Sequence, residues 1–284
     1  MRHPNVPESL DGWSILHRMF RFHRRRWDAL DASNRTRIAA EAIEYLAPLH
    51  DDPETDVAAA QLLGHKADIM LTHYARSFDA LGEAQIGFDK LAFRDYLEPT
   101  ASYVSILELG LYADSPKFHA ELRERGLKPH SNEWNEAFDA LLEEAARHPR
   151  SAERLWAKIP ARRYCCFYPM DKKRGETTNW YALPYEERAA LMLEHGKIGR
   201  SFHGQVTQVI SGSIGFDDFE WGVDLYADDP QIFKKLIYEM RFDQASALYA
   251  IFGPFYTGMQ FAIRALGAFL DGHERAELLH AAPT

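Results

Sequence analysis

The alternation of apolar and polar positions divides the chain into two similar sets of strand-like and helix-like segments. The first set opens with an aromatic and aliphatic stretch at 13–22, typical of a strand, followed by an amphipathic helical stretch at 34–46. A strand at 64–74, a helix at 77–91 and a strand at 102–112 complete it. This mixture of strand and helix patterns favours an α+β fold.

The second set has the same alternation and one further strand. In chain order it contains a strand at 162–170, a helix at 184–195, strands at 205–215 and 220–227, a helix at 230–242 and an extended segment at 247–258. Each set approximates the strand–helix–strand–strand–helix–strand order of a ferredoxin-like unit. The order of the elements, rather than internal sequence identity, therefore predicts two fused ferredoxin-like units with antiparallel sheets.

The same pattern sets the expected division of the chain. An N-terminal ferredoxin-like unit takes residues 1–112, and a C-terminal unit takes residues 161–284. The polar, mostly helical stretch at 113–160 connects the two units and can cover a site. From about residue 259 the amphipathic run MQFAIRALGAFL predicts a packed helical tail.

Composition narrows the class of protein. Apolar residues make up 46% of the chain, enough for a full core, while the formal net charge of -9 argues against a nucleic-acid binder. The basic run at 24–26 is expected to be a solvated face. No stretch approaches the ~18 consecutive apolar residues of a membrane span, and the N-terminal segment lacks the apolar core of a signal peptide. We therefore expect a cytoplasmic protein.

The two cysteines, Cys165 and Cys166, are adjacent. This spacing excludes a disulfide framework and argues against a site of spaced thiolate ligands. On a strand, the two thiols would face opposite sides. We expect them to be ordinary reduced packing residues.

The segment PYEERAALMLEHG is the most informative part of the chain. Pro184 suits a first helical turn, and Gly196 suits a left-handed residue that closes a helix directly after His195. Leu191 and Met192 lie three to four residues before His195, so its imidazole would project from an apolar stripe. A neutral imidazole there suits an axial ligand of haem iron, but it equally suits a structural histidine. With 13 histidines in the chain, this segment alone does not decide.

The run FYPMDKKR at 167–174 offers a second group of chemically useful side chains. Pro169 and the charges after it predict the exit of a strand into a loop, with the oxidisable phenol of Tyr168 at the strand end. Met170 and Lys172 could contact the ring and a carboxylate of a flat, apolar ligand. The alternative is a polar hairpin with a solvated Lys-Lys-Arg run.

Several segments together resemble the chlorite dismutase family, and specifically its coproheme decarboxylase branch. They are YPMDKKR, NWYALPYEERAALMLEHGKIGR, QVISGSIGFDDFEWGVDLYADDPQIFKKLIYEMRFDQAS and, in the first half, SYVSILEL. The resemblance is strong over about 154–258, weaker over 11–112, poor in the connection and absent from the tail. It implies two fused ferredoxin-like units of the dimeric α/β-barrel type, a porphyrin site in the C-terminal unit and a ring-shaped homopentamer.

The resemblance also assigns site residues. The axial iron ligand would be His195, and the catalytic residues would be Tyr168 and Lys172. The substrate-binding residues would be Arg154, Tyr168, Pro169, Met170, Asp171, Lys172, Gln208, Arg241 and Ser246.

The residue on the far side of the porphyrin separates the branches of this family. Chlorite dismutases carry an arginine there, so Gln208 argues for a decarboxylase. Actinobacterial decarboxylases use a histidine instead. His203, five residues before Gln208, departs from the pattern, and we expect it at the surface rather than at the iron.

The activity implied by the resemblance is the last step of a haem synthesis. Iron coproporphyrin III would be both substrate and cofactor, hydrogen peroxide the oxidant and haem b the product. Tyr168, oxidised to a phenoxyl radical, would take hydrogen from a propionate β-carbon before carbon dioxide leaves. The expected partners are the porphyrin, the peroxide and, by contact, a coproporphyrin ferrochelatase. The sequence does not identify the donor of coproheme, and no nucleic acid and no membrane span are expected. The alternatives are a haem carrier or sensor without turnover, a chlorite dismutase or slow peroxidase, and an interaction protein without porphyrin.

Overall fold

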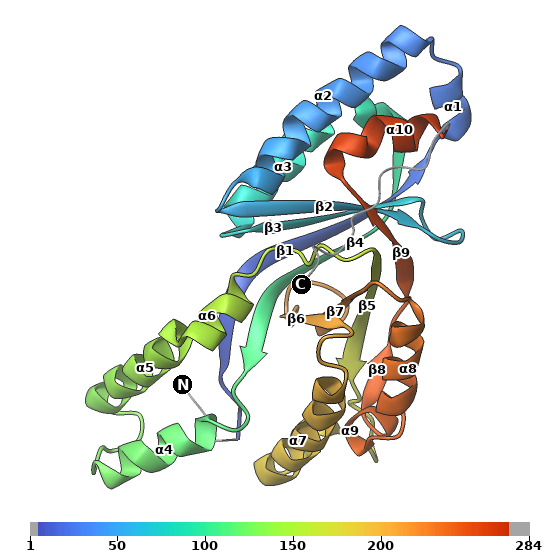
Figure 1. The fold of residues 1–284 in the computed structure, drawn as a ribbon. Helices are drawn as coiled ribbons and strands as arrows, with labels where there is room; N and C mark the ends of the chain where they lie inside the picture. The colour runs from blue at the N-terminus through green and yellow to red at the C-terminus, as the bar shows by residue number, and fades with distance from the viewer. Residues whose placement is uncertain (1–4, 273–284) are drawn as a thin grey trace.

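Strands from both halves of the chain join into one antiparallel sheet that closes on itself (Figure 1). The computed structural model describes residues 5–272. The strand order is β7-β6-β4-β1-β3-β2-β9-β5-β8, and a further pairing of β5 with β7 closes the ring. The order is β4-β1-β3-β2 in the first half and β9-β5-β7-β6 in the second, so each half is a ferredoxin-like unit. The predicted fold class is confirmed.

The helices of the first half lie together at one end of the molecule, and its long strands β1 and β4 run from there toward α4 (Figure 1). They are β1 (Ser9–Phe22), α1 (Arg24–Asp28), α2 (Ala32–Asp51), β2 (Thr55–Leu62), β3 (Ile69–Ala75), α3 (Phe78–Asp89), the 3-10 helix η1 (Ala92–Tyr96) and β4 (Leu97–Gly110). The connection that follows is helical, as predicted, with α4 (Ser115–Glu124), α5 (Asn132–Arg147) and α6 (Pro149–Leu155).

The second half places its two long helices on the opposite side of the ring from α2 and α3 (Figure 1). Its elements are β5 (Tyr164–Lys172), η2 (Trp180–Ala182), α7 (Tyr185–Ser201), β6 (Thr207–Gly212), β7 (Trp221–Ala227), α8 (Gln231–Met240), α9 (Gln244–Ala247), β8 (Ala250–Phe252), β9 (Tyr256–Phe261), η3 (Ile263–Ala265) and α10 (Leu266–Asp271).

Helix α2 shows how sequence spacing places a helix on the outer face of the sheet. Ile38, Ala42 and Leu46 recur every four residues, which puts them on one side of the helix, and all three are buried in one apolar cluster. Asp31 begins the helix by accepting a hydrogen bond from the backbone N–H of Asn34. Amphipathic helices therefore cover the outside of the ring.

The inner face of the ring is buried and partly polar. His17 on β1 is fully buried, and its Nε2 lies 3.0 Å from Oδ1 of Asp224 on β7. The same imidazole stacks on Phe167 with ring centroids 4.1 Å apart. Strand alternation therefore sends Phe167 inward and its neighbour Tyr168 outward, toward α7 and α8.

Cys165 and Cys166 follow the same alternation. Both thiols are free and buried, and Cys165 belongs to the inner apolar cluster while Cys166 belongs to the outer one. Burial raises the pKa of Cys166 to about 11 and also raises that of Cys165. The prediction of reduced packing residues on opposite sides of a strand is confirmed.

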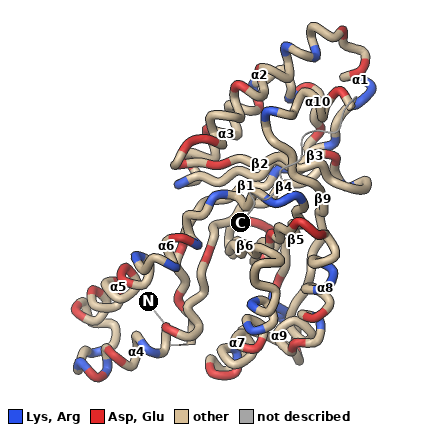
Figure 2. The backbone as a smooth tube through the Cα atoms, viewed as in Figure 1, with Lys and Arg blue, Asp and Glu red and all other residues tan. Residues whose placement is uncertain are grey.

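Charged residues are dispersed over both halves of the tube, with acidic and basic positions intermixed (Figure 2). The described residues include no helix long and apolar enough to cross a membrane.

The first correction concerns the strand predicted at 64–74. Only β3 lies there, and it begins at Ile69, because residues 63–68 form the turn before it. The strand on the other side of that turn, β2, was not predicted. The sequence of β2, TDVAAAQL, carries three alanines, which have low strand propensity. It becomes a strand because β3 and β9 pair with its two edges.

The second correction concerns the end of the histidine helix. Helix α7 continues through Gly196 to Ser201, so the prediction that Gly196 closes it is wrong. Ile198 packs in the apolar cluster beneath α7 and α8, which favours another helical turn. The glycine that takes a left-handed conformation after this helix is Gly204, with φ of 81°.

The third correction concerns the strand exit predicted at Pro169. Strand β5 continues to Lys172, so Tyr168 lies within the strand and not at its end. The carbonyl of Pro169 accepts a hydrogen bond from the backbone N–H of Gly253, which lies in the interruption between β8 and β9. This edge of Pro169 is therefore not paired with a regular strand. The missing N–H of Pro169 faces that interruption, where no ladder hydrogen bond is lost.

The C-terminal segments also differ from the prediction. The extended segment at 247–258 is interrupted, with β8 and β9 separated by residues 253–255. The predicted tail helix begins later, because 259–261 extend β9, and helical structure begins at η3. The remaining residues of the predicted tail, 273–284, lie outside the described residues.

Gly258 joins the two ferredoxin-like units, since it lies on β9 opposite Leu62 of β2. A Cβ at this position would clash with the backbone oxygen of Gln61. We expect Gly258→Ala to destabilise the protein by about 1–3 kcal/mol, as overpacking does. The measurement is denaturant unfolding. Gly82→Ala on α3 is the matched control, because nothing lies within 4 Å of its Cβ position; an equal loss in both variants would contradict the prediction.

Candidate functional site

The outer face of the C-terminal sheet brings together the predicted tyrosine, lysine and glutamine. Tyr168, Met170 and Lys172 alternate along β5 and therefore share one face. Gln208 on β6 pairs with Leu225 of β7, which in turn pairs with Cys166 of β5, so its side chain is on that face too. Helices α7 and α8 pack over this face (Figure 1).

Tyr168 is buried in an aromatic setting. Its ring stacks on Phe255 with centroids 4.5 Å apart and lies 5.6 Å from Phe252. Burial raises the pKa of the phenol, opposed in part by the positive charge of Arg241. The phenol therefore keeps its proton at neutral pH and can give up a hydrogen atom.

Lys172 is buried rather than solvated, which excludes the polar-hairpin alternative for this residue. Its Nζ donates to the carbonyl of Ala245 at 3.2 Å and lies 4.5 Å from the ring centre of Trp180. Burial lowers the pKa of Lys172 to about 8, although Asp243 and Glu220 favour its charged form. A buried cation with one weak acceptor can bind a carboxylate strongly.

His195 projects from α7 with a carboxylate behind it. Its Nδ1 lies 3.0 Å from Oδ2 of Asp243, whose side chain is fully buried. Ser246 donates to the same oxygen through Oγ at 3.0 Å, and its backbone N–H donates to the other oxygen. An Nδ1–H donated to Asp243 orients the imidazole and leaves Nε2 as the nitrogen that can bind a metal.

Asp243 is a residue of the candidate site that the sequence did not identify. Its local signal is that of a helix cap, because it precedes α9 and accepts from the N–H of Ser246. His195 lies 48 residues earlier, and nothing in the spacing links the two.

Gln208 reaches the helix that carries the histidine. Its Nε2 donates to the carbonyl of Gly199 at 3.1 Å, one turn beyond His195. A Cβ at Gly199 would lie 3.4 Å from that nitrogen and 3.6 Å from Cε of Met240. Gly199 thus allows α7 to approach the sheet, and Gln208 contacts the helix that carries His195.

A buried carboxylate, Glu220, orders the far end of β5. Its Oε2 accepts from the backbone N–H of Lys172 at 3.0 Å and from the hydroxyl of Tyr181 at 2.7 Å. Arg174 lies 3.5 Å from its other oxygen. Burial and the bond to Glu220 raise the pKa of Tyr181. No sequence motif had singled out Glu220.

Three other residues predicted at the site do not lie buried on the sheet face that carries Tyr168. Arg241 is exposed, with its guanidinium 4.1 Å from the ring centre of Phe252, beside Tyr168. Pro169 and Asp171 alternate onto the other face of β5, and Asp171 accepts from the backbone of Glu220. Their assignment to the substrate stays a prediction.

Arg154 and His203 lie at the surface. Arg154 is exposed on α6, a helix that packs against β1 and β4, and its contact with the substrate stays a prediction. His203 is exposed after the end of α7, as expected.

Fold and site together define a class of protein: a ring of two ferredoxin-like units in which a carboxylate-backed histidine lies on a helix over the sheet. That sheet carries a buried tyrosine and lysine and a half-buried glutamine. Within residues 5–272 no group of three or more His, Cys, Asp and Glu side chains is arranged to hold a metal ion. A single such histidine suits the axial position of an iron porphyrin, whose ring supplies the other ligands.

The chain belongs to the chlorite dismutase family, whose family model, described as "Chlorite dismutase", matches residues 35–261. It is 42% identical over 259 residues to a coproheme decarboxylase of Staphylococcus saprophyticus, covering 90% of this chain and 94% of that protein. It is 39% identical over 274 residues to a putative heme-binding protein of Haloquadratum walsbyi, covering 94% of this chain and 47% of that protein.

Solved structures agree with the fold. A heme-binding protein from Thermus thermophilus superimposes with a TM-score of 0.80 at 36% identity, covering 95% of this chain and all of that one. A mutant chlorite dismutase from Candidatus Nitrospira defluvii gives a TM-score of 0.69 at 18% identity, covering 92% and 96%. At that identity the second likeness concerns the fold alone.

Proposed function

We propose that this enzyme converts two propionates of iron coproporphyrin III to vinyl groups with hydrogen peroxide, and so produces haem b. The observation that carries the proposal is the buried Tyr168 on the same sheet face as Lys172 and Gln208, beneath the helix that bears His195. The names of relatives at 40–42% identity support it, since they are coproheme decarboxylases.

Each residue has a chemical role in this proposal. His195, oriented by Asp243, holds the iron of the substrate through Nε2. Lys172 pairs with the carboxylate of the reacting propionate, and Tyr168 takes part as the hydrogen-atom acceptor once oxidised. Gln208 can hydrogen-bond peroxide but cannot act as a strong acid or base.

The reaction balances for each propionate. The side chain loses one hydrogen from its β-carbon and its carboxyl group as carbon dioxide, which removes two electrons. One hydrogen peroxide accepts those electrons and becomes two waters, so two peroxides are consumed per haem b. The iron porphyrin supplies the redox chemistry when bound, and the protein supplies orientation.

The test mixes purified protein with iron coproporphyrin III and dilute hydrogen peroxide. We expect carbon dioxide and a product with the mass of haem b. Binding without mass loss would favour a haem carrier or sensor. The names of the Haloquadratum walsbyi and Thermus thermophilus proteins say that those proteins bind heme. Rapid oxygen release from chlorite would favour a dismutase, against which Gln208 argues.

The low pKa of Lys172 leads to a pH prediction. The folded protein loses the Lys172 charge as the pH rises through about 8, so its attraction for an ionised propionate disappears above that pH. We expect kcat/KM for coproheme to fall on the alkaline side of pH 8. Lys172→Arg, which keeps its charge, should remove this alkaline limb; an unchanged limb in that variant would assign it to another group.

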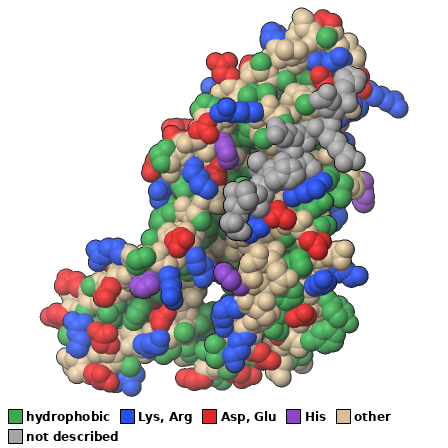
Figure 3. Space-filling model, viewed as in Figure 1, with side chains coloured by type: hydrophobic (Ala, Val, Ile, Leu, Met, Phe, Trp, Pro, Cys, Tyr) green, Lys and Arg blue, Asp and Glu red, His purple; other side chains and the backbone are tan. Residues whose placement is uncertain are grey.

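We also propose a cytoplasmic homopentamer that contacts a coproporphyrin ferrochelatase. Exposed apolar side chains support an association surface: Figure 3 shows them over the end of the C-terminal half, and Tyr238, Phe242 and Leu248 are 64%, 72% and 51% exposed. Light scattering should give five times the 32.6 kDa of one chain.

The unit boundaries proposed near residues 112 and 160 can be tested by limited proteolysis.

A further inference from the structure

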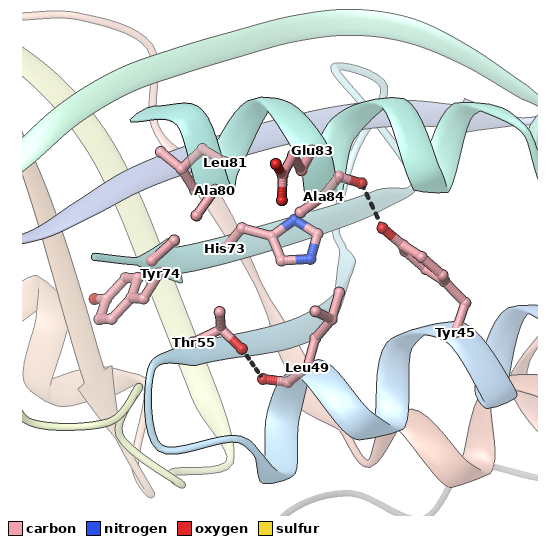
Figure 4. A pocket seen from close by; sticks show the side chains of 10 residues that line it. Tyr45, Leu49, Thr55, His73, Tyr74, Ala80, Leu81, Glu83 and Ala84 are labelled. Atoms are coloured by element: carbon pink, nitrogen blue, oxygen red, sulfur yellow. Dashed lines mark hydrogen bonds between the residues drawn. The ribbon is translucent and has the colours of Figure 1, made fainter. Parts of the chain in front are cut away.

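The N-terminal unit contains a cavity that the proposed reaction does not use. It lies between α2, α3 and the outer face of β2 and β3, with a volume of about 240 Å³ (Figure 4). This is the same face of a ferredoxin-like sheet that, in the C-terminal unit, carries Tyr168 and Lys172. Most of the wall is apolar and comes from Leu49, Ala80, Leu81 and Ala84.

One buried histidine points into this cavity without a hydrogen-bond partner. His73 projects from β3 into the space between the two helices, as Figure 4 shows. It is 2% exposed, and neither Nδ1 nor Nε2 has a partner. Strand register puts His73 beside Leu16, on a face where aliphatic residues pack. Buried polar groups are nearly always paired, so two unpaired ring nitrogens in a cavity indicate an external partner.

Two hydroxyl groups of the cavity already have partners for their protons. The hydroxyl of Tyr45 donates to the carbonyl of Ala84 at 2.9 Å, and that of Thr55 donates to the carbonyl of Leu49 at 2.7 Å. Both bonds are drawn in Figure 4. They hold the wall in shape. The hydroxyl of Tyr74 has no partner either, but Tyr74 belongs to the apolar cluster on the inner face of the ring. On the outer face, His73 can therefore recognise a ligand by hydrogen bonding.

The charges around the cavity favour a neutral ligand. Burial, with the nearby positive charge of Arg18, lowers the pKa of His73 to about 4, so the imidazole is neutral with one donor and one acceptor. Arg18 is itself buried and pairs with Asp89 at 2.6 Å. Glu83 lines the cavity from the exposed side of α3, where its carboxylate disfavours an anion.

The volume sets the size of the ligand. An apolar cavity of about 150 Å³ is enough to bind benzene. A space of about 240 Å³ therefore accommodates one six-membered ring with a small polar substituent.

We propose that this cavity is a second binding site, separate from the porphyrin site, for a neutral single-ring molecule with a hydroxyl group, of the phenol class. The hydroxyl hydrogen-bonds to a ring nitrogen of His73, and the aromatic ring lies against Leu49, Ala80 and Ala84. This inference does not depend on the proposed reaction.

The experiment titrates phenol into the full chain labelled with ¹⁵N-histidine, while NMR follows the imidazole nitrogens. We expect a saturable shift of the His73 signals, with a Kd of about 1 mM or tighter for a ligand of this size. His73→Leu identifies those signals and should weaken phenol binding, followed by calorimetry, about fivefold through loss of the hydrogen bond. His203→Gln, at an exposed position, is the matched control and should bind as the original chain does.

Two cavity-filling variants keep the test decisive. Ala84→Leu and the less buried Ala80→Met should each abolish phenol binding, and either one suffices if the other fails to fold. Benzoate should bind at least tenfold more weakly than phenol. No saturable shift of His73, phenol binding that survives the filled cavity, benzoate that binds as well as phenol, or a crystal structure with phenol in which only water contacts His73 would each overturn the proposal.

Discussion

Tyr168→Phe should retain coproheme binding and lose about 10²–10⁴-fold in the rate of decarboxylation, the range seen when a residue in proton or hydrogen transfer is removed. The ring that packs on Phe252 and Phe255 is preserved, so the shape of the site changes little. Only the oxidisable O–H is removed. Binding is measured by titration of the Soret band, and turnover by product mass after addition of peroxide.

The strand supplies a matched control for this substitution. Tyr164 lies four residues earlier on β5, on the same face, and is partly buried in the same apolar cluster. Tyr164→Phe should keep full activity. Turnover by Tyr168→Phe at the original rate would disprove the radical role of Tyr168, even if binding were unaffected.

His195→Ala should reduce coproheme affinity by more than about 100-fold, because removing an axial ligand exceeds the 10–100-fold cost of removing its outer partner. The Soret band should shift, since the iron loses its nitrogen ligand. His203→Ala, at an exposed position just beyond α7, should leave both affinity and spectrum unchanged. An unaltered Soret band in His195→Ala would assign the iron to another residue.

The Asp243→Asn variant distinguishes the effect of Asp243 on the orientation of His195 from its effect on the stability of the fold. Asparagine still caps α9, because its side chain can accept from the N–H of Ser246. It removes the negative charge behind His195, so coproheme affinity should fall about 10–100-fold. The iron–histidine stretching frequency should also fall, while the unfolding midpoint of the porphyrin-free protein stays the same. An unchanged frequency would leave Asp243 with a capping role only.

Local patterns determined much of the C-terminal site. Tyr168, Met170 and Lys172 share a face wherever that segment is a strand, because side chains alternate with a period of two. The apolar stripe before His195 similarly placed its imidazole on the packed side of a helix. The residues that carry the resemblance to the family were therefore available from the sequence, together with the fold class.

Two errors came from judging local signals without their neighbours. Gly196 has the sequence of a helix stop, but α7 continues because Ile198 and Gly199 pack against α8 and β6. The alanine-rich β2 lacks strand propensity, and pairing on both edges makes it a strand. In both cases tertiary packing outweighs a local preference of about 1 kcal/mol or less per residue.

The sequence by itself determined the family, the two ferredoxin-like units and the side chains that alternate onto one face of β5. Only the tertiary structure decided that Lys172 is buried, that Asp243 stands behind His195 and that Gln208 contacts the histidine-bearing helix. The reason is physical: alternation and helical spacing act between near neighbours in the chain, whereas these three arrangements depend on closure of the sheet and on helix packing between distant segments. His195 is named by its motif, but its partner is found only in the fold.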